Sequence, residues 1–137
     1  MRSKKPILLV EDDEVDAMTV RRALKEIQVT NKLHHAGNGE EALEFLRNKA
    51  NERPCLILLD LNMPRMNGIE FLKEVNDDEA IKAIPKVVLT TSKDERDRVE
   101  SFKLSAAGYV AKPVDYHQFV EAMKTVNMYW TLSETPE

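Results

Sequence analysis

Residues 55–64 read CLILLDLNMP, and in this stretch four consecutive apolar residues are followed at once by an aspartate. Because the apolar residues do not alternate with polar ones, residues 56–59 predict a strand that is covered on both faces. Asp60 follows at the end of this strand, and Pro64 ends the segment. Since the strand is buried, a carboxylate at its end requires an explanation.

Four other short apolar runs lie along the chain, at 7–10, 33–36, 87–89 and 109–111. Amphipathic patterns typical of helices alternate with the runs, at 15–24, 42–46, 69–75, 99–104 and 119–130. The first pattern consists of Val15, Met18, Ala23 and Leu24, and the fourth of Val99, Phe102 and Leu104. Five strands that alternate with five helices predict right-handed βαβ units and a parallel sheet. The run at 33–36 is the most polar, so we expect it at an edge of the sheet.

The composition indicates a single domain over residues 1–137, with a core at about 6–128 and a C-terminal extension at 129–137. The net charge of −4 offers no basic surface for nucleic acid. No apolar stretch approaches the ~20 residues that a membrane span needs. Cys55 is the only cysteine, which excludes an internal disulfide and fits a reducing cytoplasm, where we expect the protein.

Polar side chains follow four of the five predicted strands. They are Glu11-Asp12-Asp13, Asp60, Thr90-Thr91-Ser92 and Lys112-Pro113. Ligands of open parallel sheets bind outside the carboxyl ends of the strands, so we expect these side chains to share one crevice. Helix capping is the alternative interpretation for Asp13, and for Ser92 or Asp94. Capping explains neither Asp60 nor Lys112, and it does not explain why acids, hydroxyls and an amine converge.

Three carboxylates in one crevice repel one another unless a cation neutralises them. Hard oxygen ligands in such a cluster suit Mg²⁺, which keeps some of its waters and often bridges to phosphate oxygens. A carboxylate beside the metal can attack phosphorus and form an aspartyl phosphate. The metal, the amine of a lysine and a hydroxyl would then bind the three phosphoryl oxygens. The residues therefore favour phosphoryl transfer to an aspartate.

Four motifs carry a family resemblance: ILLVEDDEVD at 7–16, LILLDLNMPRMNG at 56–68, VVLTTS at 87–92 and GYVAKP at 108–113. Together and in this order they resemble the receiver domain of two-component response regulators. The resemblance extends over nearly the whole chain. It implies a flavodoxin-like, doubly wound α/β fold with five helices and a five-stranded parallel sheet in the order 2-1-3-4-5.

The resemblance also implies roles for single residues. It makes Asp60 the phosphoacceptor and Glu11 and Asp12 the acidic pair that binds Mg²⁺. Asp12 is the expected direct ligand of the metal, and Glu11 acts through water. Because Asp13 is adjacent, the acidic pair could instead be shifted by one residue, with Asp13 as the direct ligand. The backbone carbonyl of Asn62 matches a further metal ligand.

Other matched positions concern the phosphoryl group and the conformational switch. Thr90 matches the switch hydroxyl, Tyr109 the switch aromatic, and Lys112 the lysine that contacts the phosphoryl group. In the family the bond between Lys112 and Pro113 is cis. Gly68 matches the glycine that follows the phosphoacceptor loop.

The implied function is that of a signalling module and not of an enzyme. The module takes a phosphoryl group from a sensor histidine kinase or a small donor, changes shape, and loses the group by slow hydrolysis. An Mg²⁺-dependent phosphohydrolase that forms an aspartyl phosphate is the competing class. Such enzymes usually carry a second aspartate two residues after the first, and this chain has Asn62 there. A degenerate receiver is disfavoured because every expected polar group is present.

The form IPKVVLTTS at 84–92 and the aromatic pair at 129–130 are nearer to the stand-alone regulators that serve bacterial phytochromes. We therefore expect a phytochrome-like kinase as the partner, and output through protein contact, because no output domain follows the last helix. A homodimer is the simplest association that we expect through that helix. Its apolar stripe consists of Tyr116, Phe119, Met123, Val126 and Trp130. Kinase docking, or packing of Trp130 against its own domain, is the alternative.

Overall fold

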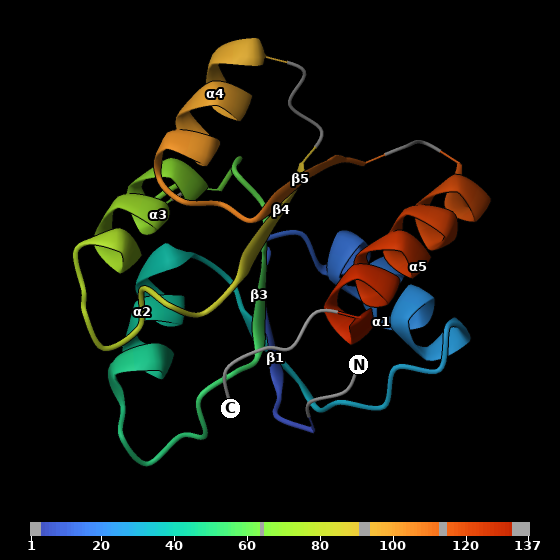
Figure 1. The fold of residues 1–137 in the computed structure, drawn as a ribbon, viewed down its shortest axis with the longest axis horizontal. Helices are drawn as coiled ribbons and strands as arrows, with labels where there is room; N and C mark the ends of the chain where they lie inside the picture. Colours follow the sequence, from blue (N-terminus) through green and yellow to red (C-terminus); the bar gives the residue numbers. More distant parts are fainter. Residues whose placement is uncertain (1–3, 64, 91–93, 113–114, 133–137) are drawn as a thin grey trace.

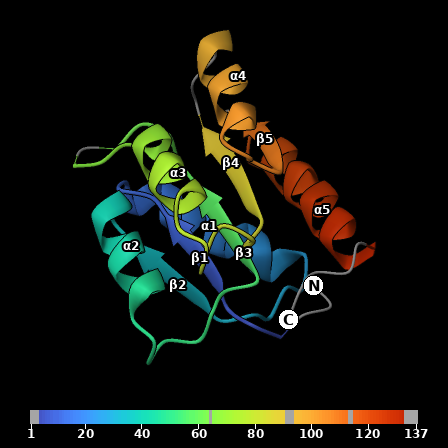
Figure 2. The ribbon, with the colours of Figure 1, turned by 60° about the vertical axis from the view of Figure 1, so that its left-hand side comes forward.

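The strand at Leu56–Leu59, β3, is the central strand of a five-stranded parallel sheet with the order β2-β1-β3-β4-β5 (Figures 1 and 2). The computed structural model describes residues 4–63, 65–90, 94–112 and 115–132, with only the backbone described for 129–132. The other strands are β1 (Ile7–Val10), β2 (Leu33–Ala36), β4 (Lys86–Thr90) and β5 (Gly108–Ala111). The predicted fold class and strand order are confirmed, and the half-buried β2 lies at an edge as predicted.

Five helices alternate with these strands in the part of the chain that the structure describes. They are α1 (Glu14–Glu26), α2 (Gly39–Arg47), α3 (Gly68–Asn76), α4 (Glu95–Lys103) and α5 (Tyr116–Leu132). Helices α2, α3 and α4 lie on one side of the sheet, and α1 and α5 lie on the other (Figures 1 and 2). None of the described helices is long and apolar enough to cross a membrane.

The unbroken apolar run of β3 is explained by two cores, one on each side of the sheet. Ile57 and Leu59 belong to the core under α2 and α3, whereas Leu56 and Leu58 belong to the core under α1 and α5. All four side chains are buried. Each contributes about 1.5–3 kcal/mol to the stability of the fold. The carboxyl end of β3 is therefore held rigidly, and Asp60 is the first residue after it.

Polar side chains define where four of the helices begin. Asp13 caps α1 and Asp94 caps α4, so the alternative interpretation of these two residues as caps is confirmed, and Asn38 caps α2. Asn67 caps α3 in a reciprocal capping box with Glu70. Each cap satisfies backbone N–H groups that have no partner within the helix. Ser92, the alternative cap, and Pro113 with its predicted cis bond lie outside the described residues.

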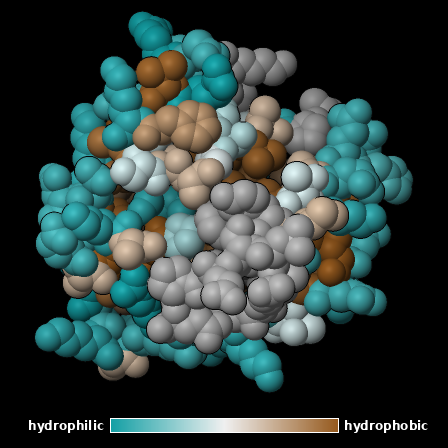
Figure 3. Space-filling model, viewed as in Figure 1, coloured by the Kyte–Doolittle hydropathy of each residue, from teal (hydrophilic) through white to brown (hydrophobic). Residues whose placement is uncertain are grey.

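The predicted apolar faces of α1 and α4 were partly wrong. Val15 is 70% exposed and Met18 is 66% exposed, while Ala17 and Val20 fill the core side of α1 together with Ala23 and Leu24. On α4, Val99 and Phe102 are exposed, and hydrophobic atoms are visible over this helix in Figure 3. Ser101 is buried instead, and its hydroxyl donates to the carbonyl of Asp97. The apolar spacing did not set the rotation of these helices about their axes, and so it did not set which residues face the sheet.

Most of the described stripe of α5 packs against its own domain. Phe119 and Met123 are buried in the core beside α1, and Tyr116 and Val126 are partly buried against it. Tyr116 is held from α1, because its hydroxyl donates to Glu26 and the guanidinium of Arg22 lies 4.2 Å from its ring centre. The side chains of residues 129–132 lie outside the described part, so a homodimer through Trp130 stays a prediction.

Candidate functional site

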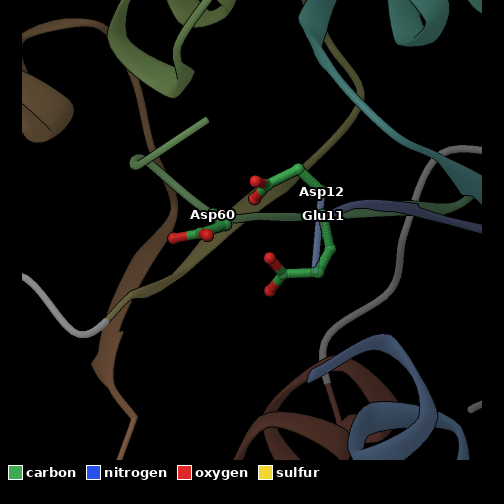
Figure 4. A group of neighbouring side chains, drawn as sticks. All are labelled: Glu11, Asp12 and Asp60. Atoms are coloured by element: carbon green, nitrogen blue, oxygen red, sulfur yellow. The ribbon is translucent and has the colours of Figure 1, made fainter. Parts of the chain in front are cut away.

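Three carboxylates converge at the carboxyl ends of two neighbouring strands. Glu11 and Asp12 follow β1, Asp60 follows β3, and one oxygen of each lies within 4.8 Å of the others. Figure 4 shows the three side chains turned toward the same region. The backbone N–H of Asp60 donates to the carbonyl of Val10 at 3.0 Å, which continues the β1–β3 pairing up to the site. The predicted convergence of these acids is thus observed.

The cluster contains Asp12 and not Asp13. One Asp13 oxygen, Oδ1, accepts from the backbone N–H groups of Val15 and Asp16, at 2.8 and 3.1 Å. Asp13 is therefore engaged as the cap of α1, while the exposed Asp12 side chain lies beside Glu11 and Asp60. This geometry favours the register in which Glu11 and Asp12 form the acidic pair.

Lys112 forms ion pairs with two acids of the cluster, Glu11 and Asp60. Among the described residues, no other ammonium group does so. The Nζ of Lys112 lies 2.5 Å from Glu11 Oε1, 3.2 Å from Asp16 Oδ2 and 4.0 Å from Asp60 Oδ2. The backbone N–H of Lys112 donates to the carbonyl of Thr90, so β4 positions the residue. Asp16 was missed by the sequence analysis. Acids are common in the first turn of a helix, so nothing in the pattern distinguished it from its neighbours.

Burial and neighbouring charges together set the protonation of Glu11 and Lys112. Glu11 is only 1% exposed, and its burial raises the pKa from the ordinary 4.5 to about 7, although Lys112 opposes the shift. Burial also disfavours the charge on Lys112. The hydrogen bond to Glu11 and the charges of Asp60, Glu11 and Asp16 outweigh that effect and raise the pKa of the ammonium. Lys112 is therefore charged at neutral pH, whereas Glu11 titrates there.

This titration predicts a loss of stability between about pH 5 and 7.5 in metal-free protein. The native Glu11 holds its proton up to about pH 7 and the unfolded one only up to 4.5. The native state therefore binds more protons in this window, and the free energy of unfolding falls as the pH rises. We expect a fall of about 2–3 kcal/mol relative to Glu11→Gln, which cannot titrate. Urea unfolding in EDTA measures it, and parallel pH profiles for the two proteins would contradict the prediction.

Thr90 and Asn62 connect β4 to the segment after Asp60. Thr90 is buried at the end of β4, and the side-chain amide of Asn62 donates to its hydroxyl at 3.4 Å. The backbone N–H of Asn62 donates to Asp60 Oδ1 at 3.3 Å. Tyr109 lies on β5 opposite Val88 and is partly buried against the core beside α2 and α3. The structure thus places Thr90 at the site and Tyr109 on the adjacent strand.

The loop between Asp60 and α3 has an unusual backbone conformation. Arg65 and Met66 have φ angles of 49° and 67°, in the left-handed region that side-chain-bearing residues rarely adopt. Helix α2 holds them there, because Gly39 N–H donates to the Met66 carbonyl and Arg65 pairs with Glu40. A Cβ on Gly39 would lie 2.8 Å from the Met66 side chain. Gly39 therefore permits the close approach that supports the loop.

Comparison with known proteins agrees with this geometry. Residues 7–124 match the response regulator receiver domain family. The chain belongs to this family. Receiver domains bind Mg²⁺ or Mn²⁺ at an acidic pocket, and they interact with sensor histidine kinases. The family acts as a signalling module.

Individual relatives of this receiver domain match over most of its length. Response regulator Rcp1 of Synechocystis is 35% identical over 130 residues, which cover 92% of this chain and 88% of Rcp1. The probable methanogenesis regulatory protein FilR2 of Methanothrix harundinacea is 32% identical over 127 residues, 90% of this chain and 82% of FilR2.

Two solved structures are similar over nearly the whole domain. The phosphorylated cyanobacterial phytochrome response regulator RcpA is 36% identical with a TM-score of 0.90, over 98% of this chain and all of RcpA. The Mn²⁺-bound form of Synechocystis Rcp1 is 34% identical with a TM-score of 0.89, over 97% of this chain and 99% of that one. The predicted resemblance to stand-alone phytochrome response regulators is confirmed.

Proposed function

We propose that this receiver domain accepts a phosphoryl group on Asp60 from a sensor histidine kinase and signals by a conformational switch through protein contact. The observation that carries the proposal is the position of Asp60. Its carboxylate lies at the end of a rigid central strand, clustered with Glu11 and Asp12 and 4.0 Å from the Lys112 ammonium. An acceptor, a set of metal ligands and a cation for a phosphoryl oxygen are therefore together in one place.

The donor set fits a hard divalent cation. The carboxylates of Glu11, Asp12 and Asp60 offer only oxygen atoms, and two of the three are buried. These carboxylates and the backbone carbonyl of Asn62 would hold Mg²⁺, with Glu11 acting through water. The ion, when bound, neutralises charge on the transferring phosphoryl group. The Mn²⁺-bound form of Rcp1 supports this assignment by similarity.

The chain itself would supply the nucleophile and the remaining contacts. An Asp60 carboxylate oxygen forms a bond to phosphorus while the bond from phosphorus to the kinase histidine breaks, and the histidine recovers its lone pair. The Lys112 ammonium and the Thr90 hydroxyl then donate hydrogen bonds to phosphoryl oxygens. Water later cleaves the aspartyl phosphate and releases inorganic phosphate.

Asn62 supports a signalling module over a phosphohydrolase. It stands two residues after Asp60, and its amide donates to Thr90. An amide cannot exchange a proton with a leaving group or an attacking water as a carboxyl group can. We therefore expect slow hydrolysis of the aspartyl phosphate. The similarity to Rcp1 and to RcpA, a phytochrome response regulator, supports a phytochrome-like kinase as the phosphoryl donor.

Incubation with acetyl phosphate tests the proposal without a kinase. In Mg²⁺ the intact mass should rise by roughly 80 Da, the mass of one phosphoryl group. In EDTA the increase should be absent, because the crowded carboxylates would repel the anionic donor. Absence of the increase at millimolar Mg²⁺ would refute the assignment.

Thr90 and Tyr109 should report the switch. A phosphoryl dianion on Asp60 attracts the Thr90 hydroxyl, which vacates space beside β4 that Tyr109 can fill by turning inward. Addition of beryllofluoride and Mg²⁺ should therefore shift amide resonances on β5 and α4 as well as those near Asp60. Nuclear magnetic resonance spectra of wild type and Asp60→Asn measure the effect. Shifts confined to the Asp60 pocket would contradict the coupling.

A further inference from the structure

The Lys112 ammonium is shared unequally among three carboxylates. Its closest partners are Glu11 at 2.5 Å and Asp16 at 3.2 Å, while Asp60 lies at 4.0 Å, beyond hydrogen-bond distance. Glu11 is buried, but the Asp16 side chain is 43% exposed on the first turn of α1. At rest, therefore, the lysine is bound chiefly by residues other than the proposed phosphoacceptor.

We propose that Asp16 is a positioning residue that holds the Lys112 ammonium away from Asp60 until a phosphoryl group takes it. The inference rests on the proposed function and deepens it, because it names a residue that regulates the same site. Asp16 and the phosphoryl group are then competitors for one cation.

The geometry indicates which partner Lys112 gives up. A phosphoryl group would approach Nζ from the side of Asp60, whose carboxylate lies 4.0 Å away, and its charge would draw the ammonium from its present partners. Loss of the Glu11 contact would leave a buried carboxylate without its cation. Loss of the Asp16 contact costs less, because water can solvate that half-exposed carboxylate at once. Asp16 is therefore the partner that the phosphoryl group displaces.

The backbone of Asp16 is held in place independently of the lysine. Its N–H donates to Asp13 Oδ1 at 3.1 Å, within the cap of α1. A substitution that keeps the size of Asp16 should therefore leave the helix intact. Glu14 is a matched control, since it is an exposed acid on the same turn and forms no ion pair with any described residue.

Labelling rates with subsaturating acetyl phosphate test the competition. Asp16→Asn should raise the second-order rate constant for labelling about three- to fivefold, the range expected for a half-exposed ion pair. Glu14→Gln should change it by less than about 1.5-fold, although it removes the same charge. Asp16→Glu, which can still reach the ammonium, should label at nearly the wild-type rate. Equal increases in Asp16→Asn and Glu14→Gln, or no increase in either, would overturn the proposal.

A second measurement directly observes the release of the Lys112 ammonium from Asp16. In the wild type, the carboxyl-carbon resonance of Asp16 should shift when beryllofluoride and Mg²⁺ are added, and that of Glu14 should not. An unmoved Asp16 resonance in protein whose Asp60 signals have shifted would overturn the proposal. If no variant labels and beryllofluoride shifts nothing, the proposed function itself fails, and the role of Asp16 falls with it. The two failures are thus distinguishable.

Discussion

Asp60→Asn should gain no phosphoryl mass under conditions in which the wild type gains roughly 80 Da. The amide has no carboxylate oxygen to attack phosphorus, so no acyl phosphate can form at this position. The variant should remain folded, because removal of one of three clustered carboxylates relieves repulsion. Thermal unfolding should therefore show an unchanged or higher midpoint, which separates loss of chemistry from loss of fold.

Asp13→Asn is the matched control for this experiment. Asp13 adjoins the acidic pair, but its side chain caps α1. Asparagine caps helices as well as aspartate does, so this variant should stay stable and should label like the wild type. Labelling of Asp60→Asn at the wild-type level would exclude Asp60 as the acceptor. Loss of labelling in Asp13→Asn would instead place Asp13 in the metal site.

Gly68→Ala should destabilise the domain by about 2–3 kcal/mol. A Cβ at this position would lie 2.6 Å from the backbone oxygen of Asp60 and 2.7 Å from the Cα of Leu61. Both atoms belong to the main chain, so no side chain can move aside to relieve the contact. Alanine normally stabilises a helix by about 1 kcal/mol relative to glycine, and the steric cost exceeds this gain. Because the displaced backbone carries Asp60, labelling should slow as well.

Gly108→Ala provides the comparison for urea unfolding of Gly68→Ala. A Cβ on Gly108 would meet only the methyl groups of Val87, at 3.6 Å, which is an ordinary contact. We expect its free energy of unfolding to lie within about 0.5 kcal/mol of the wild type. If Gly68→Ala were as stable as Gly108→Ala, the conclusion that α3 packs too closely against the Asp60 backbone to admit a Cβ would be contradicted.

The strands were the most predictable elements. Three of them, Ile7–Val10, Leu33–Ala36 and Leu56–Leu59, coincide with the predicted runs. A central strand that is covered on both faces favours apolar residues at successive positions, as in β1 and β3, and this leaves an unbroken run that sequence patterns detect easily. Once the strands were predicted to be parallel, the position of the polar residues at one edge of the sheet could also be predicted, because parallel strands have their carboxyl ends at the same edge.

The helix faces and the loop after Asp60 were less predictable. Whether Met18 or Ala17 faces the sheet depends on the rotation of α1 about its own axis, which the apolar pattern alone does not set. The same rotation brings Asp16 to Lys112, so this contact was missed. Arg65 and Met66 are not residue types that favour positive φ, and the contacts that hold them come from α2. Tertiary contacts of this kind cannot be predicted from a local sequence pattern.

The bond between Lys112 and Glu11 joins residues that are 101 positions apart in the chain. During synthesis, the strands β1 and β3 and the three clustered carboxylates emerge long before the lysine that neutralises Glu11. Contacts of such long range form late, because the entropy of closing the loop must be overcome first. A nascent or truncated chain that ends before β5 therefore carries the acidic cluster without its lysine. The proposed phosphoryl-binding set is therefore complete only when the last strand has joined the sheet.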